Sequence, residues 1–76
     1  MAGEHRTVSI RDESIRLGQL LKLADLVDQG SDAKEVLLRG LVQVNGEVET
    51  RRGRRVVPGD TVTVGGQTVG IESTSH

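Results

Sequence analysis

The sequence predicts an α+β domain in which two helices pack on a small antiparallel sheet, with a short strand at the N-terminus. Its 76 residues are enough for one small domain. Apolar residues recur at helical spacing between residues 17 and 27, and from residue 41 they alternate with polar residues and are interrupted by glycine-containing turns. The chain has no Phe, Trp or Tyr, so its 11 Val, 8 Leu and 3 Ile must form the core.

Both ends of the chain are polar. We expect residues 1–6 and 73–76 to be flexible, so that the single domain, 1–76, has its folded core at about 7–72. Apolar and polar side chains alternate over residues 7–10, which predicts a short strand ahead of the first helix.

The first helix is predicted from the spacing of its apolar residues. From Leu17 to Val27 they fall at i, i+3, i+4, i+7 and i+10, which is one stripe of an amphipathic helix. Leu23 and Leu26 should widen this stripe. We therefore expect the first helix to be the most buried element.

A second helix is predicted from about Asp32 to Arg39. Ser31 can cap its N-terminus, and Gly40 stands where a C-terminal cap glycine belongs. Glu35 and Arg39 are four residues apart and should form an outward ion pair worth only ~0.2–0.5 kcal/mol. The inner face should carry Ala33, Val36 and Leu37.

After the second helix, the sequence predicts strands joined by tight turns. Asn45-Gly46 between alternating segments is a strong hairpin signal, because both residues tolerate positive φ. Pro58-Gly59 fits the centre of a type II turn, and Gly65-Gly66 predicts a further turn. The predicted strands are 41–44, 47–50, 61–64 and 67–71, with Val56-Val57 as a further apolar segment.

The positive charge is concentrated in one part of the chain. The formal net charge is only −1, but residues 34–55 carry +3 while the segments before and after them are each −2. Four of the five residues in 51–55 are arginines, whose planar guanidinium groups match phosphate oxygens, and Gly53 lets the backbone come close to a partner. This run predicts phosphate contact on RNA; the alternative is a solvated loop that only aids solubility.

Several classes of function are excluded or disfavoured. Without cysteine there is no disulfide framework, thiolate nucleophile or cysteine-based zinc site. No segment approaches the ~20 apolar residues that span a bilayer, and no apolar stretch near the N-terminus resembles a signal peptide. His5 and His76 have no neighbour at metal-ligand spacing. We therefore expect a cytoplasmic, monomeric, non-enzymatic protein with no cofactor, no metal and no membrane contact.

The segment around the second helix resembles a known family. Ser31-Asp32-Ala33-Lys34, then Arg39-Gly40-Leu41-Val42 and Val44-Asn45-Gly46, are similar to the S4 RNA-binding domain, also called the alpha-L motif. The similarity covers roughly Ile15 to Val64, and Leu20-Leu21-Lys22-Leu23 looks like the small stand-alone bacterial members. One departure is Gly30, where many members have an arginine. That departure and the low net charge suggest weaker affinity, or a partner that supplies more of the surface.

This resemblance implies contact with structured RNA, ribosomal or transfer RNA, and an association with the ribosome. Because aromatic rings for base stacking are missing from the sequence, most contacts should go to phosphates and 2′-hydroxyls. A protein-interaction module that keeps the fold but has little RNA affinity remains the alternative. The RNA-binding residues that the resemblance implies are Lys34, Arg39, Asn45, Arg51, Arg52, Arg54, Arg55, Arg16 and Lys22.

Overall fold

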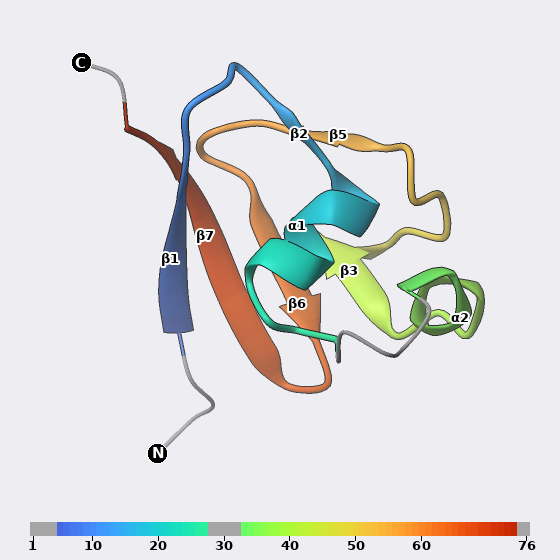
Figure 1. The fold of residues 1–76 in the computed structure, drawn as a ribbon. Coiled ribbons are helices and arrows are strands. Elements are labelled where there is room, and N and C mark those ends of the chain that lie inside the picture. The colour runs from blue at the N-terminus through green and yellow to red at the C-terminus, as the bar shows by residue number, and fades with distance from the viewer. Residues whose placement is uncertain (1–4, 28–32, 75–76) are drawn as a thin grey trace.

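The fold is α+β, as predicted, with two short helices and a mostly antiparallel sheet (Figure 1). It was obtained as a computed structural model, which describes residues 5–27 and 33–74. The elements in chain order are β1 (His5–Ile10), β2 (Ile15–Arg16), α1 (Leu17–Leu23), α2 (Ala33–Leu38), β3 (Val42–Val44), β4 (Glu47–Val48), β5 (Arg55–Val56), β6 (Thr61–Val64) and β7 (Gln67–Ser73).

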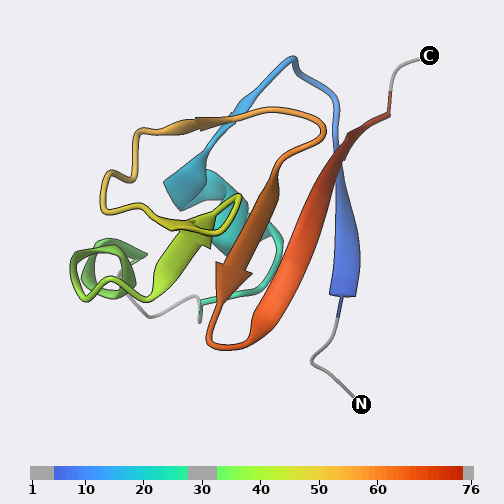
Figure 2. The same ribbon diagram turned by 180° about the vertical axis from the view of Figure 1, so that it is seen from behind.

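The main sheet has five strands in the order β1-β7-β6-β3-β4. Its strands pair antiparallel, except that β1 runs parallel to β7, with Val8 opposite Ile71. The parallel pair involves the predicted N-terminal strand, and the rest of the sheet is antiparallel, as predicted. Nearly the whole chain lies between β1 and β7, which leaves ample length for the crossover that a parallel pair requires. Figure 2 shows the two strands side by side at the edge of the molecule.

Strands β1 and β7 extend a little beyond the core expected at 7–72, because β1 begins at His5 and β7 ends at Ser73. They are held by the parallel ladder and by a hydrogen bond of 2.9 Å from the Ser9 hydroxyl to the Glu72 carboxylate.

Helix α1 ends at Leu23, four residues before the end that periodicity predicts. Asp25 has a φ of +59°, and two backbone hydrogen bonds close the helix, from Asp25 N–H to Lys22 O and from Leu26 N–H to Leu21 O. This is a Schellman motif, which a non-glycine residue completes here. Leu23 is 59% exposed, so its predicted place in the apolar stripe is wrong.

Helix α2 also ends in a Schellman motif, whose positive-φ residue is the predicted cap Gly40. Its φ is +73°, and the N–H groups of Gly40 and Leu41 donate to the carbonyls of Leu37 and Val36. The predicted N-cap Ser31, the predicted first helical residue Asp32 and the departure Gly30 lie outside the described residues.

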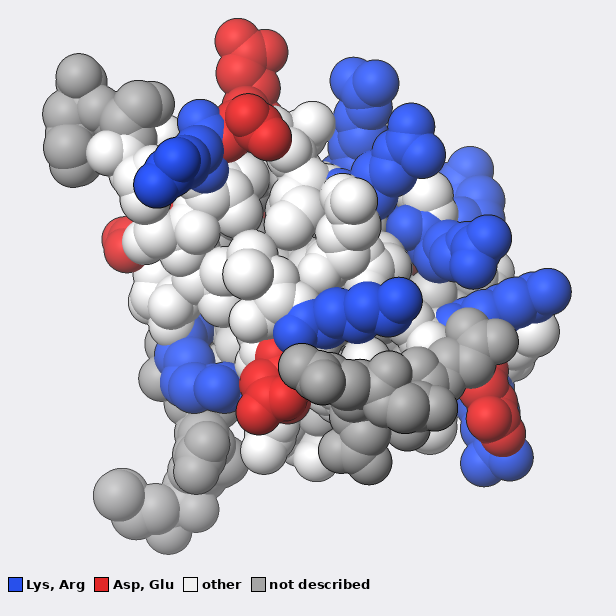
Figure 3. Space-filling model, viewed as in Figure 1, with Lys and Arg blue, Asp and Glu red and all other residues white. Residues whose placement is uncertain are grey.

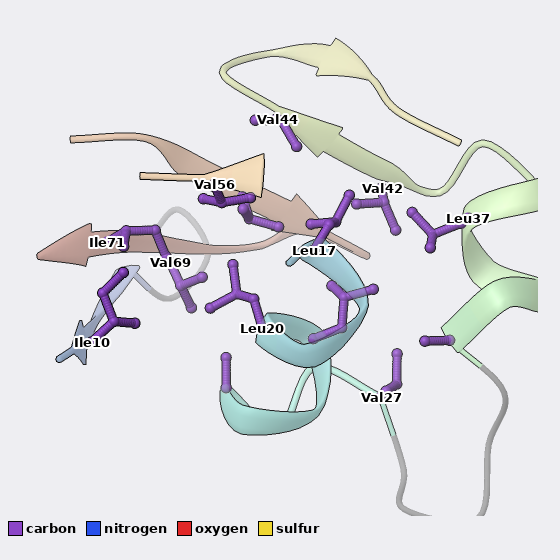
Figure 4. Close-up of a cluster of buried hydrophobic side chains, with 14 residues drawn as sticks. Ile10, Leu17, Leu20, Val27, Leu37, Val42, Val44, Val56, Val69 and Ile71 are labelled. Atoms are coloured by element: carbon purple, nitrogen blue, oxygen red, sulfur yellow. The ribbon is translucent and has the colours of Figure 1, made fainter. Parts of the chain in front are cut away.

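The core lies between the two helices and the concave side of the sheet (Figure 4). Both ends of the predicted stripe on α1 are buried, since Leu17 is inaccessible to solvent and Val27, just beyond the helix, is packed with it. The sheet supplies mainly valines. The fully buried side chains are Leu17, Leu20, Leu21, Leu37, Val42, Val44, Val56, Val62 and Val69.

The predicted turns are confirmed by their backbone angles. Asn45 and Gly46 have φ values of +55° and +85°, as a two-residue hairpin loop between β3 and β4 requires. Gly59 follows Pro58 with a φ of +101°, in agreement with the type II turn.

Candidate nucleic-acid interface

The arginine-rich segment 51–55, called here the arginine loop, is docked on the N-terminus of α1. Its last residue belongs to β5, where Arg55 lies opposite Arg16 of β2. The backbone N–H of Leu17 donates to the carbonyl of Arg54 at 2.8 Å, and that of Gly18 donates to the carbonyl of Arg52 at 3.0 Å. The first N–H groups of a helix have no partner within the helix, so the loop satisfies two of them. The arginine loop is thus fixed to the first helix through its own backbone.

Gly18 permits this close approach. A Cβ atom at position 18 would lie 3.3 Å from Cβ of Arg52, tighter than ordinary side-chain contacts. A larger residue at this position would therefore push the arginine loop away from α1.

Glu49 holds the arginine loop in place through hydrogen bonds. It is buried, with 6% of its surface exposed. One carboxylate oxygen accepts hydrogen bonds from the backbone N–H groups of Thr50 and Arg51, both at 3.0 Å, and from Nε of Arg51 at 3.3 Å. The other accepts from Nη1 of Arg54 at 3.0 Å. All four bonds favour the ionised carboxylate.

These contacts lower the pKa of Glu49 from its ordinary value of 4.5 to about 2. The largest cause is the backbone N–H of Arg51, followed by the guanidinium groups of Arg54 and Arg51, and together they outweigh the burial that would raise the pKa. The role of Glu49 was not predicted from the sequence. Its position two residues before the run of arginines was the available signal.

The side chains of the other arginines in this region are exposed to solvent. Arg16, Arg52 and Arg55 are exposed, and no side-chain hydrogen bond or ion pair engages them within the described part of the chain. Arg51 also presents 80% of its side chain to solvent despite its bond to Glu49. Several guanidinium groups are therefore available for an external partner.

A hollow of about 390 Å³ lies between α1 and the arginine loop. Its wall contains three cationic side chains from β2, α1 and the loop, and it reaches the first residue of α2. Its lining residues are Arg16, Gly18, Gln19, Lys22, Ala33, Arg52 and Gly53. The structure thus brings the predicted site residues Arg16, Lys22 and Arg52 together around one concave surface.

A second hollow is lined by Arg51, Gly53, Arg54 and Arg55. The side chains of the arginine loop therefore border two adjoining depressions. Gly53 belongs to both, which agrees with the prediction that the backbone is open to a partner at this point.

The cationic residues of α2 lie next to this region. Lys34 follows Ala33, which lines the first hollow, and is exposed. Arg39, just beyond the C-terminal end of α2, forms the predicted ion pair with Glu35 at 2.7 Å. In Figure 3, Lys and Arg side chains gather on the side where Figure 1 draws β5, its preceding loop and α2. Arg16, just before α1, and Lys22, in the last turn of α1, lie beside the arginine loop as well.

Asn45, by contrast, is exposed, and its side-chain amide is hydrogen-bonded to other residues of the protein. Its Nδ2 donates to a carboxylate oxygen of Asp60 at 3.0 Å, and its Oδ1 accepts from the backbone N–H of Thr61 at 3.0 Å. It joins the β3–β4 turn to the start of β6 and borders neither hollow.

The comparisons with known proteins agree with this architecture. A family model described as the S4 domain matches residues 8–72. The chain belongs to the S4 domain family. This S4 domain is 48% identical over 59 residues to a protein of Bacillus subtilis (strain 168) named "Probable ribosome maturation protein RlbA", covering 78% of this chain and 83% of that protein. It is 39% identical over 57 residues to the "Putative RNA-binding protein YbcJ" of Escherichia coli (strain K12), covering 75% of this chain and 81% of the relative.

The residues that the structure describes contain neither a metal-ligand cluster nor a helix that could cross a membrane. Among these residues, His, Cys, Asp and Glu side chains form no group of three or more that could hold a metal ion. Within the same part of the S4 domain, neither helix has the length and apolar character to cross a membrane.

Proposed function

We propose that this S4 domain is a small, monomeric, non-enzymatic protein of the cytoplasm that binds structured RNA, ribosomal or transfer RNA, mainly through phosphates. The observation that carries the proposal is the exposed group formed by Arg16, Arg52 and Arg55 beside α1. Arg16 and Arg55 are direct cross-strand neighbours of like charge, an arrangement that costs stability by itself. A polyanion would offset this repulsion, and the planar guanidinium groups suit phosphate oxygens.

The proposed surface extends from the arginine loop over the N-terminal part of α1 to α2. Lys22 and Lys34 border or adjoin the same hollow, and Arg39 would extend the surface to the far end of α2. Arg51 and Arg54 would contribute charge while Glu49 holds their positions. We assign Asn45 to the turn, because both ends of its side-chain amide are already used within the protein.

The relatives support the class of partner. One carries a name that refers to ribosome maturation and the other a name that refers to RNA binding. We extend this to the present chain as binding to a structured RNA of the ribosome. Without aromatic residues, recognition would depend on backbone shape and on 2′-hydroxyls more than on base stacking against rings.

The test compares two double variants of equal charge. In R52Q/R55Q, the two arginines of the loop that do not bind Glu49 are neutralised, while Arg51 and Arg54 remain to satisfy Glu49. In R6Q/R11Q, two exposed arginines outside both hollows are neutralised; because Arg6 donates a hydrogen bond to the carbonyl of Ala24 at 2.8 Å, the unfolding midpoints of both variants are compared with that of wild type first. Using ribosomal RNA fragments in a polarisation assay, we expect R52Q/R55Q to lose on the order of tenfold in affinity and R6Q/R11Q to stay within about twofold. Equal losses in both variants would contradict the proposal.

The alternative is a protein-interaction module with little RNA affinity. It is favoured by three exposed apolar side chains near the end of α2. Leu38 lies two residues before Gly40 and Leu41 directly after it, and a Cβ on Gly40 would lie 3.7 Å from Cγ1 of Val48. If wild type binds none of the RNA fragments above a scrambled control, this alternative replaces the RNA proposal.

A further inference from the structure

We propose that the hollow between α1 and the arginine loop holds one unstacked nucleotide, with its phosphate among Arg16, Lys22 and Arg52 and its base beside Gln19. The ligand class is a nucleoside monophosphate unit, either free or as an unpaired nucleotide of an RNA. If the nucleotide is part of an RNA, this inference rests on the proposed function and makes it more specific. If the nucleotide is free, the inference does not depend on RNA binding.

The charge of the hollow suits a phosphate. Three cations converge on it from β2, α1 and the arginine loop, and no acidic side chain is among its described lining residues. Neither Arg16, Lys22 nor Arg52 has a side-chain hydrogen bond or ion pair to another described residue. Glu49, the buried acid of this region, faces Arg51 and Arg54 instead. The positive charge at the hollow is therefore not neutralised by the surrounding described residues.

The size and shape of the hollow suit more than a phosphate alone. Its volume of about 390 Å³ falls within the range of small-molecule pockets, roughly 300–1,000 Å³. The side chain of Arg52 already lies against the backbone at Gly18, but Gly53 leaves part of the wall without a side chain, and a Cβ there would meet nothing within 4 Å. A flat base can therefore approach the backbone there.

The lining also contains groups that can recognise a base. Gln19 and Lys22 are three residues apart on α1, so they lie on the same face of the helix. The Gln19 amide offers both a donor and an acceptor, the pair of groups needed to read a base edge. Because the chain has no aromatic ring, a guanidinium plane such as that of Arg52 is the available surface for stacking.

The walls of the hollow are fixed before any ligand binds. Hydrogen bonds from Leu17 and Gly18 to the carbonyls of Arg54 and Arg52 attach the loop to α1. Glu49 holds the other side of the loop through backbone and guanidinium groups. A site with fixed walls loses less conformational entropy on binding.

The experiment uses the full chain and two RNA hairpins of the same stem, one fully paired and one with a single-nucleotide bulge tested with each of the four bases. We expect the preferred bulged hairpin to bind about tenfold more tightly than the paired one, the order expected for one stacked base. Gln19→Ala should reduce this ratio to near one and remove the preference among bases. The matched control is Gln67→Ala, an exposed glutamine at the β6–β7 turn outside both hollows, which should leave the ratio unchanged.

A second arm distinguishes a free nucleotide from an RNA nucleotide. AMP, GMP, CMP and UMP are titrated against the protein while the side-chain amide resonances of Gln19 are followed by NMR. Shifts that saturate and disappear in Arg52→Gln, with no preference for bulged RNA, assign the hollow to a free nucleotide. A bulge preference that Gln19→Ala removes assigns it to RNA.

The outcomes separate this inference from the proposed function. If both hairpins bind equally and no mononucleotide shifts the Gln19 amide, the inference is wrong while RNA binding stands. If neither hairpin binds but a mononucleotide does, RNA binding fails while the nucleotide site stands. If neither RNA nor mononucleotides bind, both are wrong.

Discussion

The buried carboxylate of Glu49 accepts a hydrogen bond from the guanidinium of Arg54, in the arginine loop, at 3.0 Å. Its second oxygen binds the backbone at the start of the same loop. One buried acid thus fixes the path of a segment in which four like charges would otherwise repel each other. This arrangement keeps the other arginines exposed at defined positions beside α1.

Replacing Glu49 should change how stability depends on pH. The pKa of Glu49 is about 2 in the folded chain and 4.5 ordinarily, so the folded state favours the ionised form. Its contribution is complete above the ordinary pKa and is lost as the pH falls from about 4.5 towards 2. Glu49→Gln should lower the free energy of unfolding by about 2 kcal/mol at pH 7. As the pH falls from about 4.5 towards 2, the free energy of unfolding should decrease less in this variant than in wild type.

The measurement is urea unfolding followed by circular dichroism at several pH values. Glu13→Gln is a suitable control, because Glu13 is an exposed acid whose side chain has no hydrogen bond or ion pair within the described part of the chain. Parallel pH profiles for Glu49→Gln and wild type would show that Glu49 does not act as described.

Gly18 should be intolerant of a larger side chain, whereas Gly53 should not. A Cβ at position 18 meets Arg52, and Gly18→Val would add two further carbons at that contact. We expect a loss of about 1–3 kcal/mol from overpacking. Gly53→Ala should be nearly neutral, since its Cβ would lie in open space. Equal unfolding midpoints for Gly18→Val and wild type would contradict the close contact.

Asn45 should contribute to stability through its turn and not through RNA. Asn45→Ala loses the bond to Thr61 and places alanine at a φ of +55°, so we expect a loss of about 2–3 kcal/mol. Glycine adopts a φ of +55° without strain, so the free energy of unfolding should fall by about 1 kcal/mol less in Asn45→Gly than in Asn45→Ala. RNA affinity measured for the folded Asn45→Gly variant should match wild type; a tenfold decrease would make Asn45 an RNA contact.

Glu35 should restrain Arg39. The two form an exposed ion pair at 2.7 Å, a type of contact worth about 0.3–0.5 kcal/mol. If Arg39 belongs to the RNA surface, Glu35→Gln should raise RNA affinity about twofold by releasing it and by removing a negative charge. Glu47→Gln, which removes an equal charge from β4, provides the control. The same increase in both variants would assign the effect to net charge alone.

Local signals predicted most of the elements. The turns at Asn45-Gly46 and Pro58-Gly59 and the cap at Gly40 depend on backbone angles that those residues favour, so short sequence patterns suffice. The end of α1 was mispredicted because apolar residues continue at helical spacing to Val27, although the helix stops at a Schellman motif completed by Asp25.

Contacts between distant residues could not be predicted from such patterns. The parallel pairing of β1 with β7 joins residues 63 positions apart, as in Ser9 and Glu72, and the short strands β2 and β5 carry little periodicity of their own. The pairing of Arg16 with Arg55 places the loop on the first helix, so the hollow and the role of Glu49 emerge only once the chain is folded.

The salt dependence of RNA binding tests the phosphate surface most directly. With about four arginines on phosphates, the slope of log K against log salt should be roughly −3 to −4 for wild type. For R52Q/R55Q, its magnitude should fall by about 1.4–1.8, since two phosphate contacts are lost, and for R6Q/R11Q it should not change. A flat response in wild type, or one slope shared by wild type and R52Q/R55Q, would contradict a phosphate-binding role for the arginine loop.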